Sequence, residues 1–374
     1  MRVLITGANG FIGKNLKQRL AERPDVELLL ISRDSSRAEF EDSISKADFV
    51  FHIAGINRPR DPDEFWQGNS DLTSWLCERL MTRAKEGDKV PVVFSSSTQA
   101  ALENDYGRSK RDAEAAVFGY GRDCDVPVHV FRLPNVFGKW SRPNYNSVVA
   151  TFCHNFSQGL PIAINNPEAP LRLVYVDDVV ARFVALLDGA SPNRDAEGFD
   201  QVHPEYATTV GELAKTIREF RDSRDTLVTP RVGAGLTRAL YSTYLSFLRP
   251  EQFSYTVPQH GDSRGVFVEM LKTPDSGQFS FFTAHPGITR GGHYHHSKTE
   301  KFLVISGTAR FKFRHMQTGE EYQLVTHGEK SEIVETVPGW THDITNIGDG
   351  DLVCMLWANE IFDRDNPDTY ACPL

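Results

Sequence analysis

The chain has 374 residues, of which 40% are hydrophobic and 24% charged, and its formal net charge at pH 7 is -9. This length and composition predict two ordinary globular domains and exclude a disordered chain. The acidic balance argues against nucleic-acid binding, and no apolar run reaches the roughly 20 residues of a membrane span. Five cysteines without a CxxC pair, and no leader after Met1, predict a cytoplasmic protein whose thiols are reduced and lie in the core.

In the first half of the chain, short apolar strands alternate with helices. Strands are expected at residues 2–6, 26–31, 48–53, 90–95 and 127–132, with helices such as 11–22 and 64–85 between them. Continuously apolar strands are buried on both faces, so the pattern predicts an α/β fold, a Rossmann-type doubly wound parallel sheet. Further amphipathic helices, at 175–187 and after a capping box of Thr209 and Glu212, fit a small substrate lobe.

The pattern changes within residues 224–255. Beyond it, helical periodicity is scarce, and short segments rich in Phe, Val, Ile and Thr are interrupted by Gly and Pro. That arrangement is typical of an all-β sandwich or barrel. We therefore expect an α/β domain over residues 1–240 and a β-barrel domain over residues 256–374.

A glycine motif, Gly7-Ala-Asn-Gly10-Phe-Ile-Gly13, lies between the first strand and the first helix. Such glycines allow a tight turn, a close approach of backbone to a pyrophosphate, and close helix–strand packing. A plain tight turn is the alternative, but the position after a strand favours a dinucleotide site. The second strand ends Ile31-Ser32-Arg33, without the acidic residue that would accept from the ribose of NAD, so Arg33 favours NADP.

A serine run, Ser95-Ser96-Ser97, ends the fourth strand and is followed by Tyr106-Gly-Arg-Ser-Lys110. Tyr and Lys four residues apart share one face of a helix. A phenol has a pKa of about 10, and we expect the Lys110 ammonium to lower it so that Tyr106 exchanges a proton near neutrality. With a serine hydroxyl to hold a carbonyl oxygen, the set suits hydride transfer from a nicotinamide to a ketone.

These motifs, with His52-Ile-Ala54-Gly55, Arg132-Leu-Pro134-Asn135 and Tyr175-Val-Asp-Asp178, resemble the extended short-chain dehydrogenase/reductases up to about residue 225. The resemblance implies action on a nucleotide-linked sugar. It makes Tyr106 and Lys110 catalytic and Ser97 their partner, with Ser96 and Thr98 as alternatives to Ser97. It implies a substrate site at Asn135 and Lys139, and a cofactor site formed by Gly7, Gly10, Phe11, Ile12, Gly13, Ser32, Arg33, Ala54, Gly55 and Leu133.

The second half carries a histidine cluster: His293-Tyr-His295, then Glu300, and later His342. Residues two apart in a strand point to the same face, so His293 and His295 are expected to point together into a barrel. Three imidazoles and one carboxylate predict a site for Zn, Mn, Fe or Ni, the alternative being ordinary polar side chains.

The segments around these histidines resemble the paired motifs of the cupin superfamily. Arg290-Gly-Gly-His293 also resembles a motif of cupin-like sugar 3,5-epimerases, in which that histidine is a general base and no metal is needed. The role of His293, ligand or base, is therefore open.

A reductase joined to a cupin resembles the bifunctional capsular-polysaccharide enzymes that act on UDP-2-acetamido-2,6-dideoxy-hexos-4-ulose. The resemblance implies C3 epimerisation of this UDP-linked 4-keto-6-deoxy-aminosugar in the cupin, with a divalent metal such as Zn, and then NADPH-dependent reduction of C4. The product would be a UDP-6-deoxy-talosamine-type precursor of N-acetyl-L-fucosamine, and the enzyme a homodimer. The alternatives are an epimerase/dehydratase with tightly bound NAD and a structural cupin cap, and a non-enzymatic redox-sensing module.

Overall fold

The computed structural model describes residues 1–365 and 367–374. Its contacts divide the chain into two compact units, residues 1–214 with 242–247, and residues 215–241 with 248–374. Residues 215–241 thus group with the β-rich unit. The domain limits of 1–240 and 256–374 stay a prediction.

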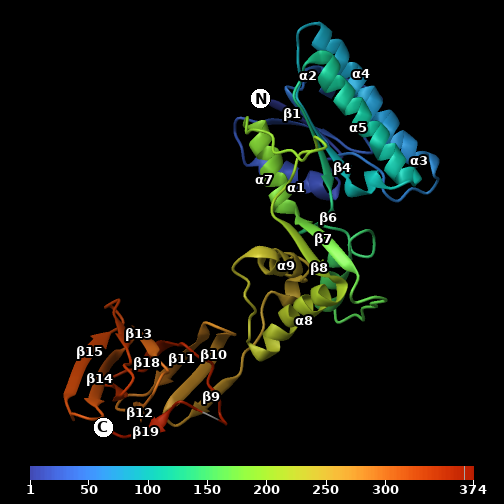
Figure 1. The fold of residues 1–374 in the computed structure, drawn as a ribbon. Coiled ribbons are helices and arrows are strands. Elements are labelled where there is room, and N and C mark those ends of the chain that lie inside the picture. The colour runs from blue at the N-terminus through green and yellow to red at the C-terminus, as the bar shows by residue number, and fades with distance from the viewer. Residues whose placement is uncertain (366) are drawn as a thin grey trace. The chain divides into compact units, whose positions relative to one another are not determined.

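The first unit is built on a five-stranded sheet (Figure 1), in the order β2-β1-β3-β4-β5. Every pairing within it is parallel. The strands are β1 Arg2–Thr6, β2 Glu27–Ile31, β3 Phe49–His52, β4 Val92–Ser97 and β5 Val128–Leu133. Their apolar runs reflect burial on both faces, and the predicted Rossmann-type fold is confirmed.

Helices cover both faces of this sheet. One face packs against α2 Arg37–Lys46, α4 Leu72–Lys85 and α5 Asp105–Cys124. The other packs against α1 Phe11–Ala21 and α7 Val176–Leu187, and Figure 1 shows the two groups on opposite sides of the strands.

The prediction of a single helix at residues 64–85 is wrong in one respect. A short helix, α3 Asp63–Phe65, leads into a π-helical turn at Trp66–Asp71 before α4 begins. A π turn adds one residue per hydrogen-bonded ring, and such turns are frequent at functional sites.

A smaller sheet completes this unit, made of β6 Asn135–Phe137, β7 Pro170–Tyr175 and β8 Glu205–Thr209. Helix α6 spans Val148–Ser157, and a 3-10 turn, η2, spans Thr98–Ala101. The predicted capping box starts α8 Val210–Thr226, because Glu212 N donates to Thr209 Oγ1 at 3.2 Å and Thr209 N to Glu212 Oε2 at 3.1 Å.

Helix α9 Gly235–Leu245 lies where the sequence predicted little helix. Its residues Leu240 and Tyr244 are almost fully buried, so tertiary packing stabilises this helix. Its periodic pattern in the sequence is too weak to have predicted it. A 3-10 turn, η3 Pro250–Gln252, follows it.

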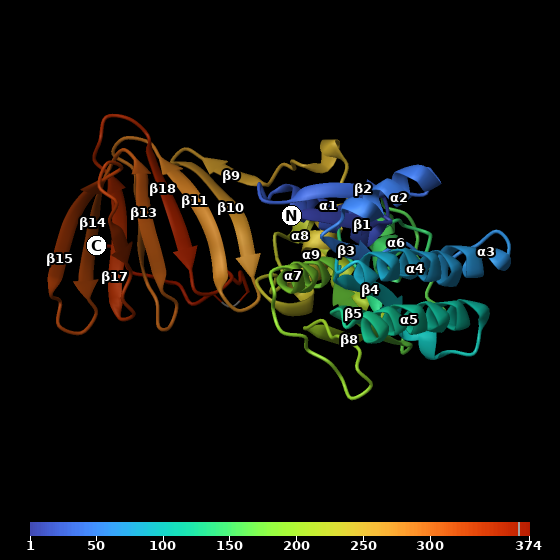
Figure 2. The same cartoon turned by 90° about the horizontal axis from the view of Figure 1, so that it is seen from above.

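The second unit contains two antiparallel sheets (Figure 2), of six strands in the order β16-β13-β18-β11-β10-β9 and five in the order β15-β14-β17-β12-β19. Inward side chains of both sheets, such as Phe302, Phe311 and Ile344, form one core. The predicted all-β cupin fold is confirmed. The strands are β9 Gln259–Asp262, β10 Gly265–Thr273, β11 Gly277–Ala284, β12 Thr289–Tyr294, β13 Glu300–Ser306, β14 Thr308–His315, β15 Glu321–His327, β16 Ile333–Glu335, β17 Trp340–Asn346, β18 Leu352–Ala358 and β19 Tyr370–Ala371.

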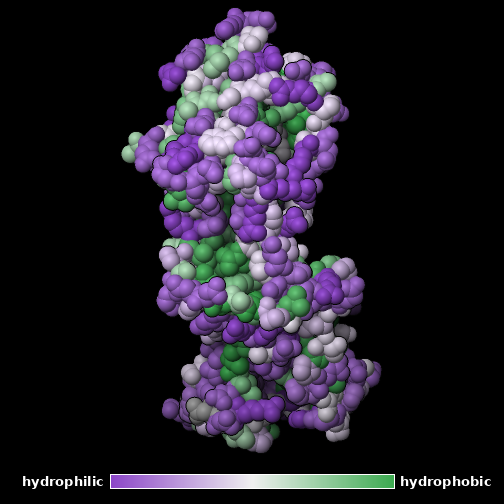
Figure 3. Space-filling model, turned by 90° about the vertical axis from the view of Figure 1, so that its right-hand side faces the viewer, coloured by the Kyte–Doolittle hydropathy of each residue, from purple (hydrophilic) through white to green (hydrophobic). Residues whose placement is uncertain are grey.

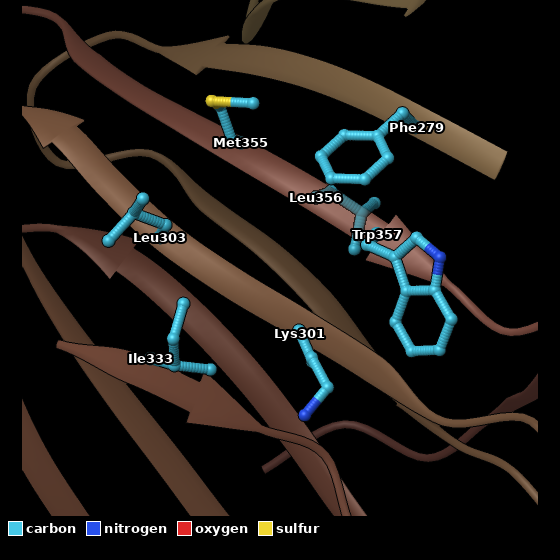
Figure 4. A pocket seen from close by; sticks show the side chains of 7 residues that line it. All are labelled: Phe279, Lys301, Leu303, Ile333, Met355, Leu356 and Trp357. Atoms are coloured by element: carbon cyan, nitrogen blue, oxygen red, sulfur yellow. The ribbon is translucent and has the colours of Figure 1, made fainter. Parts of the chain in front are cut away.

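The six-stranded sheet has a hollow of about 420 Å³ on its outer side (Figure 4). It is lined by Phe279, Lys301, Leu303, Ile333, Met355, Leu356 and Trp357. Lys301, the one titratable group among them, is paired with Glu335 on the neighbouring strand β16. This apolar hollow therefore offers no set of groups for acid–base or metal chemistry.

The surface seen in Figure 3 is largely hydrophilic. Among the described residues no helix is both long and apolar enough to cross a membrane. All five cysteines are free. Cys77, Cys153 and Cys354 are buried as expected, and Cys124 is partly buried and packs against the core. The expectation is wrong for Cys372, which is partly exposed.

Candidate active site and candidate metal centre

The turn between β1 and α1 requires glycine for two physical reasons. Gly7 has a φ of +70°, and a Cβ on it would lie 2.8 Å from the backbone N of Ala54. A Cβ on Gly13 would lie 2.2 Å from the carbonyl oxygen of Gly7. Gly10 is the N-cap of α1 and makes no side-chain hydrogen bond to the first N–H groups of the helix. Uncapped N–H groups at a helix N-terminus can bind an anion.

The other predicted cofactor residues lie at the carboxyl ends of the same strands. Ser32 follows β2 and donates from its N–H to Ser35 Oγ at 3.1 Å, and Arg33 beside it is exposed. Ala54 follows β3 and donates from its N–H to Thr6 Oγ1 at 3.2 Å. Leu133 ends β5 and is buried. Parallel α/β sheets bind ligands at this edge.

The predicted catalytic residues meet at that edge. Ser97 is the last residue of β4, and its hydroxyl lies near enough to the Tyr106 phenol to lower the pKa of Tyr106, against the larger, raising effect of burial. Lys110 Nζ donates to the carbonyl of Ser95 at 3.0 Å. A Cβ on Gly55 would lie 3.1 Å from Lys110 Nζ, so the ammonium sits beside the Ala54–Gly55 segment, against which the Gly7 turn packs.

Burial governs the protonation of both groups. It raises the pKa of Tyr106, with Ser97 only partly offsetting it. It lowers the pKa of Lys110 to about 8, although nearby Glu114 acts to raise it. The expected net lowering of the Tyr106 pKa is wrong, because desolvation of the ring outweighs the interactions that lower it. The phenol is therefore held in its neutral, proton-donating form.

A buried hydrogen-bond network distinguishes Ser97 from the alternative residues Ser96 and Thr98. Ser96 Oγ donates to Glu114 Oε1 at 2.5 Å, and Arg132 donates to both oxygens of Glu114, at 3.0 and 2.7 Å. Thr98 begins the η2 turn. Of the three hydroxyls, that of Ser97 is the one that acts on the pKa of Tyr106.

The start of α5 fixes the position of Tyr106. Asn104 is the N-cap and accepts from Gly107 N at 2.7 Å. A Cβ on Gly107 would lie 2.2 Å from the carbonyl oxygen of Leu102, so only glycine fits at this position, next to Tyr106. From the π turn, the buried Asn69 donates to Ser109 Oγ at 3.0 Å.

Sequence reasoning missed Asn69 and Glu114. Glu114 follows Lys110 by four residues, a spacing that marks a shared helix face and could have identified it. No local signal marks Asn69, because its role depends on the π turn and on contacts 40 residues away.

The two predicted substrate residues have protein partners. Asn135 is exposed at the start of β6 and donates to the carbonyl of Arg172 at 3.2 Å. Lys139 forms an ion pair with Asp177 of α7. Arg172 itself is paired with Glu205 at 2.9 Å.

The predicted metal ligands converge in the second unit. One ligand atom from each of His293, His295, Glu300 and His342 lies within 4.8 Å of the others. Glu300 Oε2 is 3.3 Å from His295 Nε2 and 3.5 Å from His342 Nε2. His295, Glu300 and His342 are buried and His293 is half-buried.

The donor chemistry of this cluster fits a divalent cation. His295 Nδ1 lies 2.5 Å from the carbonyl oxygen of Asp368, so Nδ1 must donate, and Nε2 presents a lone pair towards Glu300. Both ring nitrogens of His342 are buried without a hydrogen-bond partner among the described residues. A cation shared by these acceptors would satisfy them, and the set suits Zn, Mn, Fe or Ni alike.

The ionisation of the cluster agrees with this interpretation. Burial acts to raise the pKa of Glu300, but His295, His342 and Lys298 outweigh it and hold the pKa well below its ordinary value. Lys298 Nζ is 3.0 Å from Glu300 Oε1. Burial lowers the pKa of His293 to about 4, so its imidazole is neutral and available as a ligand near pH 7.

Comparisons with known proteins cover the whole chain. Residues 3–197 match the NAD dependent epimerase/dehydratase family and residues 260–370 match the polysaccharide biosynthesis C-terminal domain. The chain is 61% identical, over 100% of its length and 98% of the relative, to a UDP-2-acetamido-2,6-beta-L-arabino-hexul-4-ose reductase of Pseudomonas aeruginosa.

One solved structure is similar to this chain over its full length and another over part of it. The capsular polysaccharide assembling protein CapF of Staphylococcus aureus is 40% identical with a TM-score of 0.92, each chain being fully covered. A UDP-glucuronic acid 4-epimerase of Bacillus cereus in complex with NAD is 16% identical with a TM-score of 0.54, over 66% of this chain and 96% of that one, and shows a shared fold alone.

Proposed function

This chain belongs to the NAD-dependent epimerase/dehydratase family, and from that premise we propose that it reduces the C4 ketone of a UDP-2-acetamido-2,6-dideoxy-hexos-4-ulose with NADPH. The observation that carries the proposal is the meeting of Ser97, Tyr106 and Lys110 beside the glycine turn. The name of the relative from Pseudomonas aeruginosa, a reductase of such a sugar, supports the substrate class.

In the reduction, each residue has a separate task. Bound NADPH would supply a hydride that forms the new C4–H bond, while the carbonyl π electrons move to O4. Tyr106, held neutral by burial, gives its proton to O4, and Ser97 donates a hydrogen bond to the same oxygen. Lys110 as an ammonium stabilises the phenolate left behind.

The cofactor preference is also a proposal. The backbone of Gly7, Gly10, Phe11, Ile12 and Gly13 would hold the pyrophosphate at the start of α1. Arg33 is exposed and makes no ion pair among the described residues, so its guanidinium is free to meet a ribose 2′-phosphate. The glycine turn supports a dinucleotide of either kind, and Arg33 supports NADP over NAD.

We also propose that the histidine cluster serves C3 epimerisation before reduction. A 4-keto group makes the C3 proton acidic, so a base can remove it and return it to the other face. A divalent metal held by His293, His295, Glu300 and His342 would stabilise the enolate oxygen. Reduction of C4 then removes the acidity and fixes the configuration, giving a UDP-6-deoxy-talosamine-type precursor of N-acetyl-L-fucosamine for surface polysaccharide.

One pair of variants tests whether reduction and epimerisation take place at two separate sites. With the UDP-4-ketosugar, Tyr106→Phe is expected to abolish NADPH oxidation, followed by absorbance, while solvent deuterium still exchanges at C3. His342→Ala is expected to abolish the exchange and to spare reduction of a substrate already epimerised. Loss of both reactions in Tyr106→Phe would contradict two separate sites.

The same assay tests the alternative of an epimerase/dehydratase with tightly bound NAD. Release of one NADP⁺ per sugar reduced excludes that alternative. We propose further that the enzyme is a cytoplasmic homodimer, and sedimentation velocity measures its mass in solution.

A further inference from the structure

The last residues of the chain, 367–374, here called the C-terminal segment, contact the histidine cluster. The carboxylate of Asp368 accepts four hydrogen bonds. Oδ1 accepts from His296 N at 2.9 Å, and Oδ2 accepts from Ser297 N, Lys298 N and Ser297 Oγ at 2.7, 2.8 and 3.0 Å. Residues 296–298 are three of the four residues that link the ligands His295 and Glu300, so Asp368 holds the loop that sets the separation of these two ligands.

The same residue also orients a ligand directly. The carbonyl oxygen of Asp368 accepts from His295 Nδ1 at 2.5 Å. A carbonyl oxygen has no hydrogen to give, so this contact fixes the tautomer of His295 and directs Nε2 to the centre of the cluster.

The rest of the segment holds the strands that carry the remaining histidines. Strand β19 pairs with β12, with Ala371 opposite His293. Thr341 Oγ1, next to His342 in β17, donates to the carbonyl of Cys372 at 2.5 Å. The segment therefore contacts the strands that carry His293 and His342, and the loop between His295 and Glu300.

We propose that the C-terminal segment is part of the metal site and that Asp368 is its positioning residue. This inference rests on the proposed function only in requiring that the cluster bind a metal. Partners that orient metal ligands change metal affinity by about 10- to 100-fold when they are removed. An asparagine at position 368 has one acceptor oxygen in place of two, so it leaves at least one N–H of residues 296–298 without its acceptor.

The test uses the full-length chain, stripped with a chelator and titrated with Co²⁺ against a competing chelator. The visible Co²⁺ absorption reports both affinity and ligand geometry. We expect Asp368→Asn to weaken Co²⁺ binding by about 10- to 100-fold and to alter the Co²⁺ spectrum. Asp365→Asn removes the same charge from an exposed side chain that accepts no hydrogen bond from another described residue, and is expected to match the unchanged chain.

A second measurement separates local from global damage. NADPH binding to the first unit, titrated by fluorescence, is expected to be equal in all three proteins. If Asp368→Asn binds Co²⁺ as tightly as Asp365→Asn with the same spectrum, the positioning role is wrong. If the unchanged chain itself binds no Co²⁺, the proposed metal site fails and this inference fails with it. A weakened Co²⁺ affinity with unchanged NADPH binding supports both.

Discussion

Lys110 shows how a single buried residue limits the proposed reduction. Its ammonium faces a backbone carbonyl, and burial lowers its pKa to about 8. Tyr106 keeps a raised pKa, so it stays protonated where Lys110 begins to lose its charge. We therefore expect the lysine, and not the tyrosine, to set the alkaline limit of the proposed reduction.

We expect kcat/KM for NADPH oxidation to fall as the pH rises through about 8, because deprotonated Lys110 no longer stabilises a phenolate. Lys110→Met should be slower by about 10²- to 10⁴-fold and should lack this limb. Initial rates at limiting sugar between pH 6 and 10 measure the profile. A rate that stays flat to pH 10 would show that the charge on Lys110 is not needed.

The burial of His52 leads to a separate prediction about the free energy of unfolding. Its ring contacts Thr6 Oγ1 at 2.7 Å and Thr73 Oγ1 at 2.8 Å, and burial, helped by Lys110, lowers its pKa to about 3. The unfolded chain, with a histidine pKa of about 6.5, binds a proton that the folded chain does not. The free energy of unfolding should therefore decrease as the pH falls from about 6.5 towards 3, by about 1.4 kcal/mol per pH unit from this residue.

Urea titrations at several pH values measure that slope. His52→Gln should be less stable at pH 7, yet its stability should depend less steeply on pH below 6.5. Equal slopes in the two proteins would contradict a neutral buried His52.

At the scale of one element, α5 carries both proposed catalytic side chains, and glycine is required at position 107 beside them. Gly107→Ala should destabilise the chain by about 1–3 kcal/mol and displace Tyr106, since the new Cβ would meet the Leu102 carbonyl at 2.2 Å. Gly119→Ala in the same helix is the matched control, because its nearest contact is 3.8 Å away, at the end of the Arg122 side chain. That control should be stabilising by up to about 1 kcal/mol.

Thermal unfolding compares the two alanine variants, and NADPH oxidation shows whether Tyr106 has moved. Similar melting temperatures and similar rates for both variants would mean that the turn before α5 relaxes at little cost.

At the scale of the whole molecule, the two proposed reactions belong to two different units of the chain. Removing metal with a chelator should abolish deuterium exchange at C3 and lower the melting temperature, because binding to the folded state stabilises it. Reduction of the epimerised sugar should continue at its original rate. Restoring the metal should recover the exchange, and loss of reduction on chelation would contradict independent sites.

The sequence by itself determined what depends on neighbours along the chain. Apolar runs predicted the parallel strands, glycine spacing predicted the turn after β1, and the spacings of Tyr106 with Lys110 and of His293 with His295 placed each pair on one face. These patterns are readable because a helix or strand repeats its geometry every few residues.

Only the tertiary structure decided the interactions between residues that lie far apart in the sequence. Ser96 is engaged by Glu114, 18 residues away, which leaves the Tyr106 contact to Ser97. Lys139 is paired with Asp177, and Asp368 holds a loop about seventy residues earlier. Burial then reversed the expected pKa shift of Tyr106, because desolvation depends on everything packed around the ring and no local pattern records it.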